Sequence, residues 1–156
     1  MLHLIPRPLH RAALNAAHEV RKVWWRLARP RVAGVRVVAL DGRGRVLLVR
    51  HGYGSRNWMT PGGGLRRGED PLAAGARELR EECGCGLRQP RLIAVVEEDL
   101  FGATNVIHVI GGRLDGTPQG DGREVLACAL FAADGLPPDL PERLRGPLPG
   151  WMSDQA

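Results

Sequence analysis

Residues 61–87 read PGGGLRRGEDPLAAGARELREECGCGL, and this stretch decides how the rest of the chain is interpreted. We expect a helix over residues 70–83, because apolar residues recur there at helical spacing and glycines follow. At 3.6 residues per turn, Glu78, Glu81 and Glu82 then share one face of this helix. The roughly opposite, core-facing side carries Leu72, Ala76, Leu79 and Cys83.

The three carboxylates repel one another unless a positive charge lies over them. Carboxylate oxygens are ligands that Mg²⁺ and Mn²⁺ prefer, and proteins commonly hold Mg²⁺ with a few carboxylates and the phosphates of a substrate. Upstream, Gly62, Gly63 and Gly64 carry no side chain, so a bound group can approach the backbone closely. A glycine loop followed by an acidic helix therefore suggests a metal-assisted reaction at phosphate.

An arginine- and glutamate-rich helix also has an ordinary explanation as a solvated surface with i,i+4 ion pairs. The spacing favours function, because the stretch follows the pattern G-x5-E-x7-R-E-U-x-E-E-x-G-U, where U is apolar. This pattern resembles the Nudix box. The matching residues are Gly63, Glu69, Arg77, Glu78, Leu79, Glu81, Glu82, Gly84 and Cys85. With the lead-in from Trp58 to Gly63 and the order of predicted strands, the resemblance extends over roughly residues 32–140.

The resemblance implies an α+β fold, with a central mixed sheet between helices in an α/β/α sandwich. It also implies Mg²⁺-dependent hydrolysis of the pyrophosphate bond in a nucleoside diphosphate linked to another moiety, with Mn²⁺ as an alternative ion. Nucleoside triphosphates, ADP-ribose, dinucleoside polyphosphates and capped RNA ends are candidate substrates of this kind. An attacking water activated by metal agrees with the chemistry, because pyrophosphate needs its charge neutralised before attack.

The resemblance assigns roles to individual side chains of the box. Glu78, Glu81 and Glu82 match the metal-binding positions, and the carbonyl group of Gly62 is a further candidate ligand. Arg77 matches the arginine that orients a glutamate through a salt bridge. Glu69 is nine residues before Glu78 and falls out of phase with it on a helix, so we expect it to support the loop.

The general base is open between the box and a later glutamate. Glu97, Glu98 and Glu124 are the later candidates, and we favour Glu124 because it follows a polar loop and precedes a predicted strand. An exposed loop carboxylate is the alternative for that residue.

Substrate contacts are expected from Gly63 and Gly64 and from Arg50, which ends a predicted strand and could bind phosphate bidentately. His51 is a candidate helper beside Arg50, and solvated loop charge is the alternative for both. Trp58 is expected to pack in the core more than to stack on a base.

The composition describes an ordinary globular domain. The 156 residues are 44% apolar and 25% charged, and no run of eighteen apolar residues occurs. Three cysteines without a disulfide or zinc spacing indicate reduced thiols and a cytoplasmic protein. We therefore expect one catalytic domain over residues 32–156, with residues 1–31 as a basic helical extension.

The extension carries most of the positive charge. Residues 1–36 hold eight Lys or Arg side chains against one Glu, a net charge of +7, and the remainder carries −2. Residues 1–10 look irregular, and residues 11–28 predict an amphipathic helix ended by Pro30. Its apolar stripe is Ala13, Ala17, Val20, Trp24 and Leu27. Packing on the domain or in a homodimer is the leading interpretation; an anionic membrane surface, a targeting segment and RNA contact are the others.

Five strands are expected elsewhere, at residues 32–40, 45–50, 91–98, 106–114 and 125–132. Residues 61–68 predict a glycine loop, and the proline-rich residues 135–149 allow at most one short helix, near residues 141–144. A Nudix-fold nucleotide sensor without catalysis and an RNA-binding regulator remain the alternative functions. Loss of a box glutamate would favour the sensor, and none is lost.

Overall fold

A computed structural model describes residues 7–28 and 31–155, except for the side chains of residues 7–12, 25 and 26. Of residues 1–10, which were expected to be irregular, residues 1–6 lie outside the described residues, as does the expected helix stop at Pro30. Residues 7–10 are already helical, so that part of the expectation is wrong. The helices are α1 (Arg7–Ala28), α2 (Pro71–Cys83), α3 (Glu142–Arg145) and α4 (Leu148–Ser153), with a 3-10 turn η2 (Ala133–Gly135). The strands are β1 (Arg31–Leu40), β2 (Val46–His51), β3 (Trp58–Met59), β4 (Gly62–Gly64), β5 (Gly86–Leu100), β6 (Ala103–Asp115) and β7 (Val125–Phe131).

β1 is the centre of a mixed sheet. It pairs in parallel with β6 and antiparallel with β2 and β4, and the main strand order is β3-β2-β1-β6-β5. β7 pairs with β2. The expected α+β class with a mixed central sheet is therefore confirmed.

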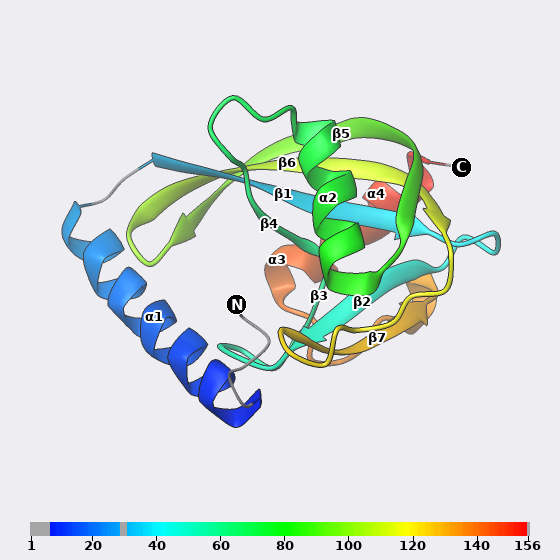
Figure 1. Cartoon of the computed structure of the whole chain (residues 1–156). Coiled ribbons are helices and arrows are strands. Elements are labelled where there is room, and N and C mark those ends of the chain that lie inside the picture. The colour runs from blue at the N-terminus through cyan, green and yellow to red at the C-terminus, as the bar shows by residue number, and fades with distance from the viewer. Residues whose placement is uncertain (1–6, 29–30, 156) are drawn as a thin grey trace.

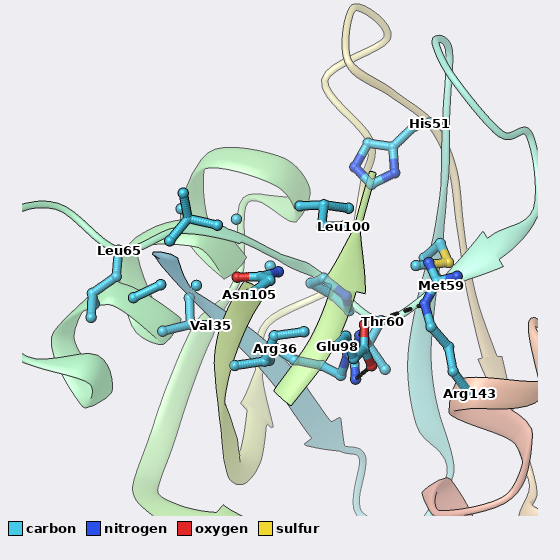
Figure 2. A pocket seen from close by; sticks show the side chains of 18 of the residues that line it. Val35, Arg36, His51, Met59, Thr60, Leu65, Glu98, Leu100, Asn105 and Arg143 are labelled. Carbon is cyan, nitrogen blue, oxygen red and sulfur yellow. Dashed lines mark hydrogen bonds and ion pairs between the residues drawn. The ribbon is translucent and has the colours of Figure 1, made fainter. Parts of the chain in front are cut away.

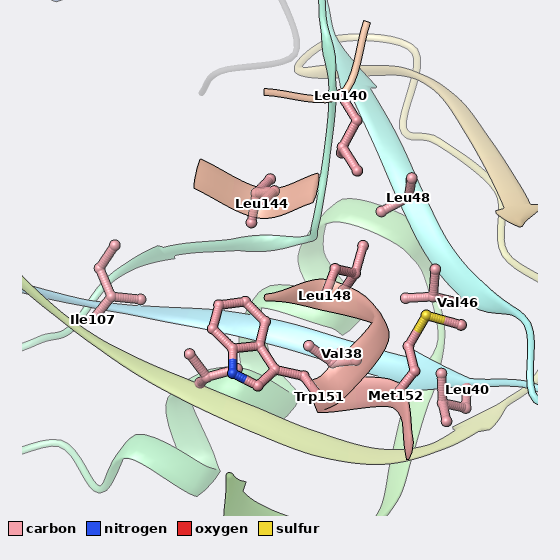
Figure 3. Packing of buried hydrophobic residues seen from close by; sticks show 11 residues of the cluster. Val38, Leu40, Val46, Leu48, Ile107, Leu140, Leu144, Leu148, Trp151 and Met152 are labelled. Atoms are coloured by element: carbon pink, nitrogen blue, oxygen red, sulfur yellow. The ribbon is translucent and has the colours of Figure 1, made fainter. Parts of the chain in front are cut away.

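Alternation along β1 and β2 divides the core into two clusters, one on each face of the sheet. On one face, Val37 and Leu47 pack with Leu79 and Cys83 of α2. On the other face, the cluster shown in Figure 3 joins strand residues to α3 and α4. Its members are Val38, Leu40, Val46, Leu48, Ile107, Val109, Leu140, Leu144, Leu148, Trp151 and Met152. Helices thus cover both faces, as Figure 1 shows and as an α/β/α sandwich requires.

Local signals explain the bounds of α2. The side chain of Asp70 accepts a hydrogen bond from the N–H of Ala73 and caps the first turn, where Pro71 needs no donor. Gly84 ends the helix at φ 65°, a left-handed conformation that suits glycine. The predicted helix over residues 70–83 is therefore confirmed to within one residue.

The predicted glycine loop contains a strand. β4 pairs residue by residue with β1, from Gly34 opposite Gly64 to Arg36 opposite Gly62. The close approach explains the composition, because a Cβ on Gly62 would lie 2.2 Å from the carbonyl oxygen of Val35. Glycine thus serves backbone pairing here, which the sequence pattern alone did not indicate.

The C-terminal segment holds more helix than expected. α3 corresponds to the predicted short helix. The sequence did not predict α4, because a proline-rich segment disfavours helix interiors. Pro147 and Pro149 lie at the start of α4, where the missing N–H groups have no helical acceptor. α4 then places Trp151 and Met152 in the core.

α1 does not pack on the domain through its apolar stripe, so that part of the leading interpretation is wrong, and packing in a homodimer stays a prediction. Its predicted apolar stripe faces away from the domain, and Val20, Trp24 and Leu27 are exposed. The helix instead contacts the domain through polar residues, with the N–H of Gly54 donating to Asn15 Oδ1 at 3.3 Å. Figure 1 shows α1 beside the sheet, near the turn between β5 and β6. No helix among the described residues is long and apolar enough to cross a lipid bilayer.

The described cysteines are free thiols. Cys83 and Cys85 are buried, and Cys128 is half-buried. The sulfurs of Cys83 and Cys128 lie 3.7 Å apart, where α2 packs on β7. They contribute to the same core face as Leu79.

Candidate active site

An acidic cavity of about 450 Å³ lies between α2 and the strand β4. Glu78, Glu81 and Glu82 reach it from α2, because they share the helix face opposite the buried Leu79 and Cys83. Its full lining is Leu14, His18, Arg21, Tyr53, Gly62, Gly63, Gly64, Glu78, Glu81, Glu82, Asp121 and Glu124. Five carboxylates therefore face one space.

Arg77 connects the helix to the preceding loop. Its guanidinium donates to Glu69 at 2.8 Å and 3.0 Å, to Glu78 at 2.6 Å and to Glu81 at 3.2 Å. It also donates to the carbonyl oxygen of Gly64 at 3.2 Å. The Arg77 side chain thereby lowers the pKa of Glu69 to about 2, and these carboxylates raise the pKa of Arg77. Arg77 holds the acidic face and the glycine strand in one geometry.

Glu82 is fixed by two donors on the other side. Nε2 of His51 lies 2.9 Å from Oε1 of Glu82, and the N–H of Gly62 donates to Oε2 at 3.0 Å. Burial would lower the pKa of His51, but the Glu82 hydrogen bond and the charges of Glu82, Glu124 and Asp121 raise it. His51 is thus disposed to carry a proton next to Glu82.

Glu78 lies against Gly63 at the centre of the cavity. A Cβ on Gly63 would be 2.6–2.8 Å from the carboxylate atoms of Glu78. Burial raises the pKa of Glu78, Arg77 opposes the shift, and the charges of Glu82 and Glu81 add to it. The absence of a side chain at Gly63 is what allows this carboxylate its position.

Glu124 reaches the cavity from the loop before β7. The side chain of Asp121 accepts from the N–H groups of Arg123, Glu124 and Val125, each at 2.9 Å, and so fixes the turn. The carbonyl oxygen of Glu124 accepts from the N–H of Gly52 at 2.8 Å, which ties this loop to the loop after β2.

The carboxylates of the acidic cavity also affect Tyr53. Burial and the charges of Glu124 and Glu82 raise its pKa to about 12. The hydroxyl group of Tyr53 therefore stays protonated at neutral pH.

A second cavity of about 620 Å³ adjoins the first and is shown in Figure 2. The two share Arg21 and the residues of β4 in their linings. In the second cavity, Glu98 lies between Arg36, at 2.9 Å and 3.2 Å, and Arg143, at 3.4 Å. The hydroxyl group of Thr60 is buried here without a hydrogen-bond partner among the described residues. A ligand with a polar edge would satisfy it.

Some predicted residues lie elsewhere. Arg50 points to the α3 side of the sheet, pairs with Asp139 at 2.8 Å and lies over the Trp58 ring at 4.6 Å. It lines neither cavity, so its predicted contact with substrate phosphate has no support in the geometry. Trp58 packs edge-on against Phe131, as expected of a core residue. Neighbouring strand residues face opposite sides, which is why His51 reaches Glu82 and Arg50 does not.

Of the three later general-base candidates, Glu124 alone lines the cavity of the α2 carboxylates. Glu97 is exposed and pairs with Arg31, and Glu98 lies in the second cavity. The sequence interpretation missed Asp121, Tyr53, His18 and Arg21. Asp121 begins a run typical of an Asx turn, and this pattern could have indicated Asp121 from the sequence. For the other three, long-range packing brings the residue to the cavity.

The donor set suits a hard divalent cation such as Mg²⁺, because three carboxylates from one helix face a cavity next to backbone groups. Among the side chains that the structure describes, no three from Asp, Glu, His and Cys lie close enough together to hold a metal ion by themselves. Arg77 engages Glu78 and Glu81, and His51 engages Glu82. An open, incomplete set is what Mg²⁺ uses when substrate phosphates and water complete its coordination.

Comparison with known proteins agrees with this geometry. A family model described as "NUDIX domain" matches residues 30–151 of this chain. An RNA pyrophosphohydrolase of Photorhabdus laumondii is 42% identical over 60 residues, 38% of this chain and 34% of that protein. The matches span between 31% and 39% of the curated relatives' own length.

Two solved structures share the fold. A MutT NUDIX hydrolase from Burkholderia pseudomallei superposes with a TM-score of 0.68 at 25% identity, over 80% of this chain and 98% of that chain. A MutT protein from Methanosarcina mazei Go1 gives 0.69 at 22%, over 81% and 96%.

The fold and the cavity define an α/β/α sandwich whose acidic helix lies against a glycine strand. With the family model matching residues 30–151, the chain belongs to the NUDIX domain family.

Proposed function

We propose that this protein hydrolyses the pyrophosphate bond of a nucleoside diphosphate linked to another moiety, with Mg²⁺ or Mn²⁺. The observation that carries the proposal is the convergence of Glu78, Glu81, Glu82 and Glu124 on one cavity, with Arg77 bound to two of them. Family membership and the RNA pyrophosphohydrolase relatives support the reaction class.

Glu78, Glu81 and Glu82 would hold the divalent ion, with the carbonyl group of Gly62 as a further ligand. The ion supplies charge neutralisation at the pyrophosphate and a lowered pKa for an attacking water. Arg77 restricts Glu78 through the 2.6 Å contact, and His51 does the same for Glu82. The backbone of Gly63 and Gly64 lets the phosphates approach the strand.

Glu124 would take the proton from the attacking water. It faces the same cavity as the three ligands, but it is on a different loop, so it can remain unligated while they bind metal. The attacking oxygen forms a bond to phosphorus, the bridging P–O bond breaks, and the water proton goes to the Glu124 carboxylate. A base held beside the reacting oxygen contributes about 100-fold or more to such a step.

The second cavity is proposed to take the nucleoside. It adjoins the acidic cavity through β4 and offers Met59, Leu65 and Ile107 beside the polar Asn105 and Thr60. Candidate substrates are nucleoside triphosphates, ADP-ribose and similar compounds, and triphosphorylated or capped RNA 5′ ends. The name RNA pyrophosphohydrolase, which the curated relatives carry, supports the RNA substrates.

The test is product release from a nucleotide and RNA panel, with Mg²⁺ and with chelator, for the wild type and Glu82→Gln. We expect one substrate class to be cleaved only with metal, and the variant to lose about 100-fold or more in kcat/KM. Glu142→Gln is the matched control, because Glu142 is an exposed glutamate on α3. Tight nucleotide binding without turnover by the wild type would support a non-catalytic sensor instead.

A further inference from the structure

Arg21 of α1 lies where the two cavities meet. It is present in the lining of both, together with Gly62, Gly63 and Gly64. A substrate that places its nucleoside in one cavity and its pyrophosphate in the other must pass this junction. The NUDIX match begins at residue 30, so the residue comes from outside the family domain.

The polar face of α1 holds Arg21 in this place. Nζ of Lys22 lies 4.9 Å from the centre of the Phe101 ring, and the His18 ring meets that of Phe101 edge-on at 5.9 Å. His18 also contacts Tyr53, and Asn15 accepts from the N–H of Gly54. These contacts span the loop after β2, where Tyr53 lines the acidic cavity, and the turn between β5 and β6, next to Leu100 of the second cavity.

The charge balance shows what a cation here would do. The acidic cavity presents five carboxylates, and Arg21 is the one arginine or lysine among its lining residues, as far as the chain is described. Arg77 is committed to Glu69, Glu78 and Glu81 from beneath. Five carboxylates carry more negative charge than one divalent ion neutralises, so a cation that lines the same cavity is well placed to attract a pyrophosphate.

We propose that Arg21 binds phosphate oxygens of the substrate, so that α1 completes the binding site of the NUDIX domain. This inference rests on the proposed function, because it assigns the phosphate contact for that same substrate. The guanidinium fork suits two phosphate oxygens, whereas a lysine would offer a single point charge.

The experiment compares the wild type with Arg21→Gln, Arg21→Lys and the control Arg43→Gln. Arg43 is exposed in the turn at the far end of β1, so its removal costs the same charge without touching either cavity. We expect Arg21→Gln to raise KM for the best panel substrate by about 10-fold or more, Arg21→Lys to recover part of the loss, and Arg43→Gln to stay near the wild type. The Mg²⁺ concentration for half-maximal rate should change little.

A binding measurement separates this inference from the proposed reaction. Inorganic pyrophosphate is titrated into each full-length variant with Ca²⁺ in place of Mg²⁺, and heat of binding gives Kd. We expect Kd to rise by about 10-fold in Arg21→Gln. Equal Kd values for wild type and Arg21→Gln would overturn the inference, whether or not hydrolysis occurs, as would a wild type that binds no pyrophosphate.

If Arg21→Gln binds pyrophosphate weakly, the competing explanation is that α1 has come away from the domain. Phe101→Ala removes the ring under Lys22 and His18 but leaves the charge of Arg21. If α1 only needs to be docked, Arg21→Lys should match Arg21→Gln when both retain the wild-type melting temperature. Partial recovery by lysine supports direct phosphate contact.

Discussion

The position of Glu78 depends on the hydrogen atom of Gly63. A methyl group there would lie within 2.6–2.8 Å of the carboxylate, which must then turn away. We expect Gly63→Ala to lower kcat/KM for the proposed reaction by about 100-fold, because displacement of a positioned group by an ångström costs that much. Steady-state kinetics measures it.

Gly42→Ala is the control for this substitution, because a Cβ at Gly42 meets nothing within 4 Å. The Glu78 carboxylate is the movable end of a side chain, so Gly63→Ala should leave the melting temperature close to that of the wild type. A variant with full activity would show that Glu78 need not hold its position.

Glu69 gives the acid limb of stability a specific cause. Arg77 lowers the pKa of Glu69 in the folded state from the ordinary 4.5 to about 2. The ion pair therefore stabilises the fold fully above pH 4.5, and this stabilisation is lost as the pH falls towards 2. We expect Glu69→Gln to be less stable than the wild type at neutral pH, with the difference shrinking between about pH 5 and pH 2. Urea unfolding across this range measures it; a gap that persists at pH 2 would contradict the assignment.

At the scale of elements, α4 is a core helix and α1 is a surface helix. Trp151 of α4 is 8% exposed and packs with Val38 and Leu148, whereas Trp24 of α1 is 56% exposed. We expect Trp151→Ala to lower the free energy of unfolding by about 3–5 kcal/mol, and Trp24→Ala by about 0.5 kcal/mol or less. Denaturant unfolding of the two variants tests the contrast, and equal losses would mean that α1 is buried by something in solution.

The helices α2 and α1 show how much of the structure the sequence could predict. α2 was predictable because its caps, its apolar face and its box residues are all local, and Asp70 and Gly84 mark its ends. The orientation of α1 was not, because a hydrophobic stripe says which face is apolar but not which face has a partner. Polar contacts from Asn15 and Lys22 decide it, and they involve residues far along the chain.

At the scale of the whole molecule, α1 lies outside the hydrophobic core. None of its described side chains belongs to either core cluster. We expect a variant that lacks residues 1–29 to unfold cooperatively, with a free energy of unfolding within about 1 kcal/mol of the full chain. Its affinity for pyrophosphate should match that of Arg21→Gln. Failure to fold would show that residues 1–31 are not an independent extension.

In the sheet and in the site, too, the sequence predicts what is local and does not predict what depends on long-range packing. The central strands were visible as valine-rich segments. The pairing of β4 with β1 was not, because the three paired residues of β4 are all glycines and carry no side-chain pattern. The box predicted which carboxylates gather. The cavity walls from Tyr53 and Asp121 come from two loops far apart in the sequence, which the Gly52–Glu124 backbone hydrogen bond joins.

The parallel pairing of β1 with β6 sets an order of events for the nascent chain. Arg31 faces Thr104 and Leu40 faces Arg113, so the ladder at the centre of the sheet joins segments made far apart in time. α2 lies inside the loop that this ladder closes, and its carboxylates are therefore synthesised before the strand that completes their support. Closing such a loop is slow compared with forming a helix, so refolding should restore α-helical circular dichroism before it restores activity.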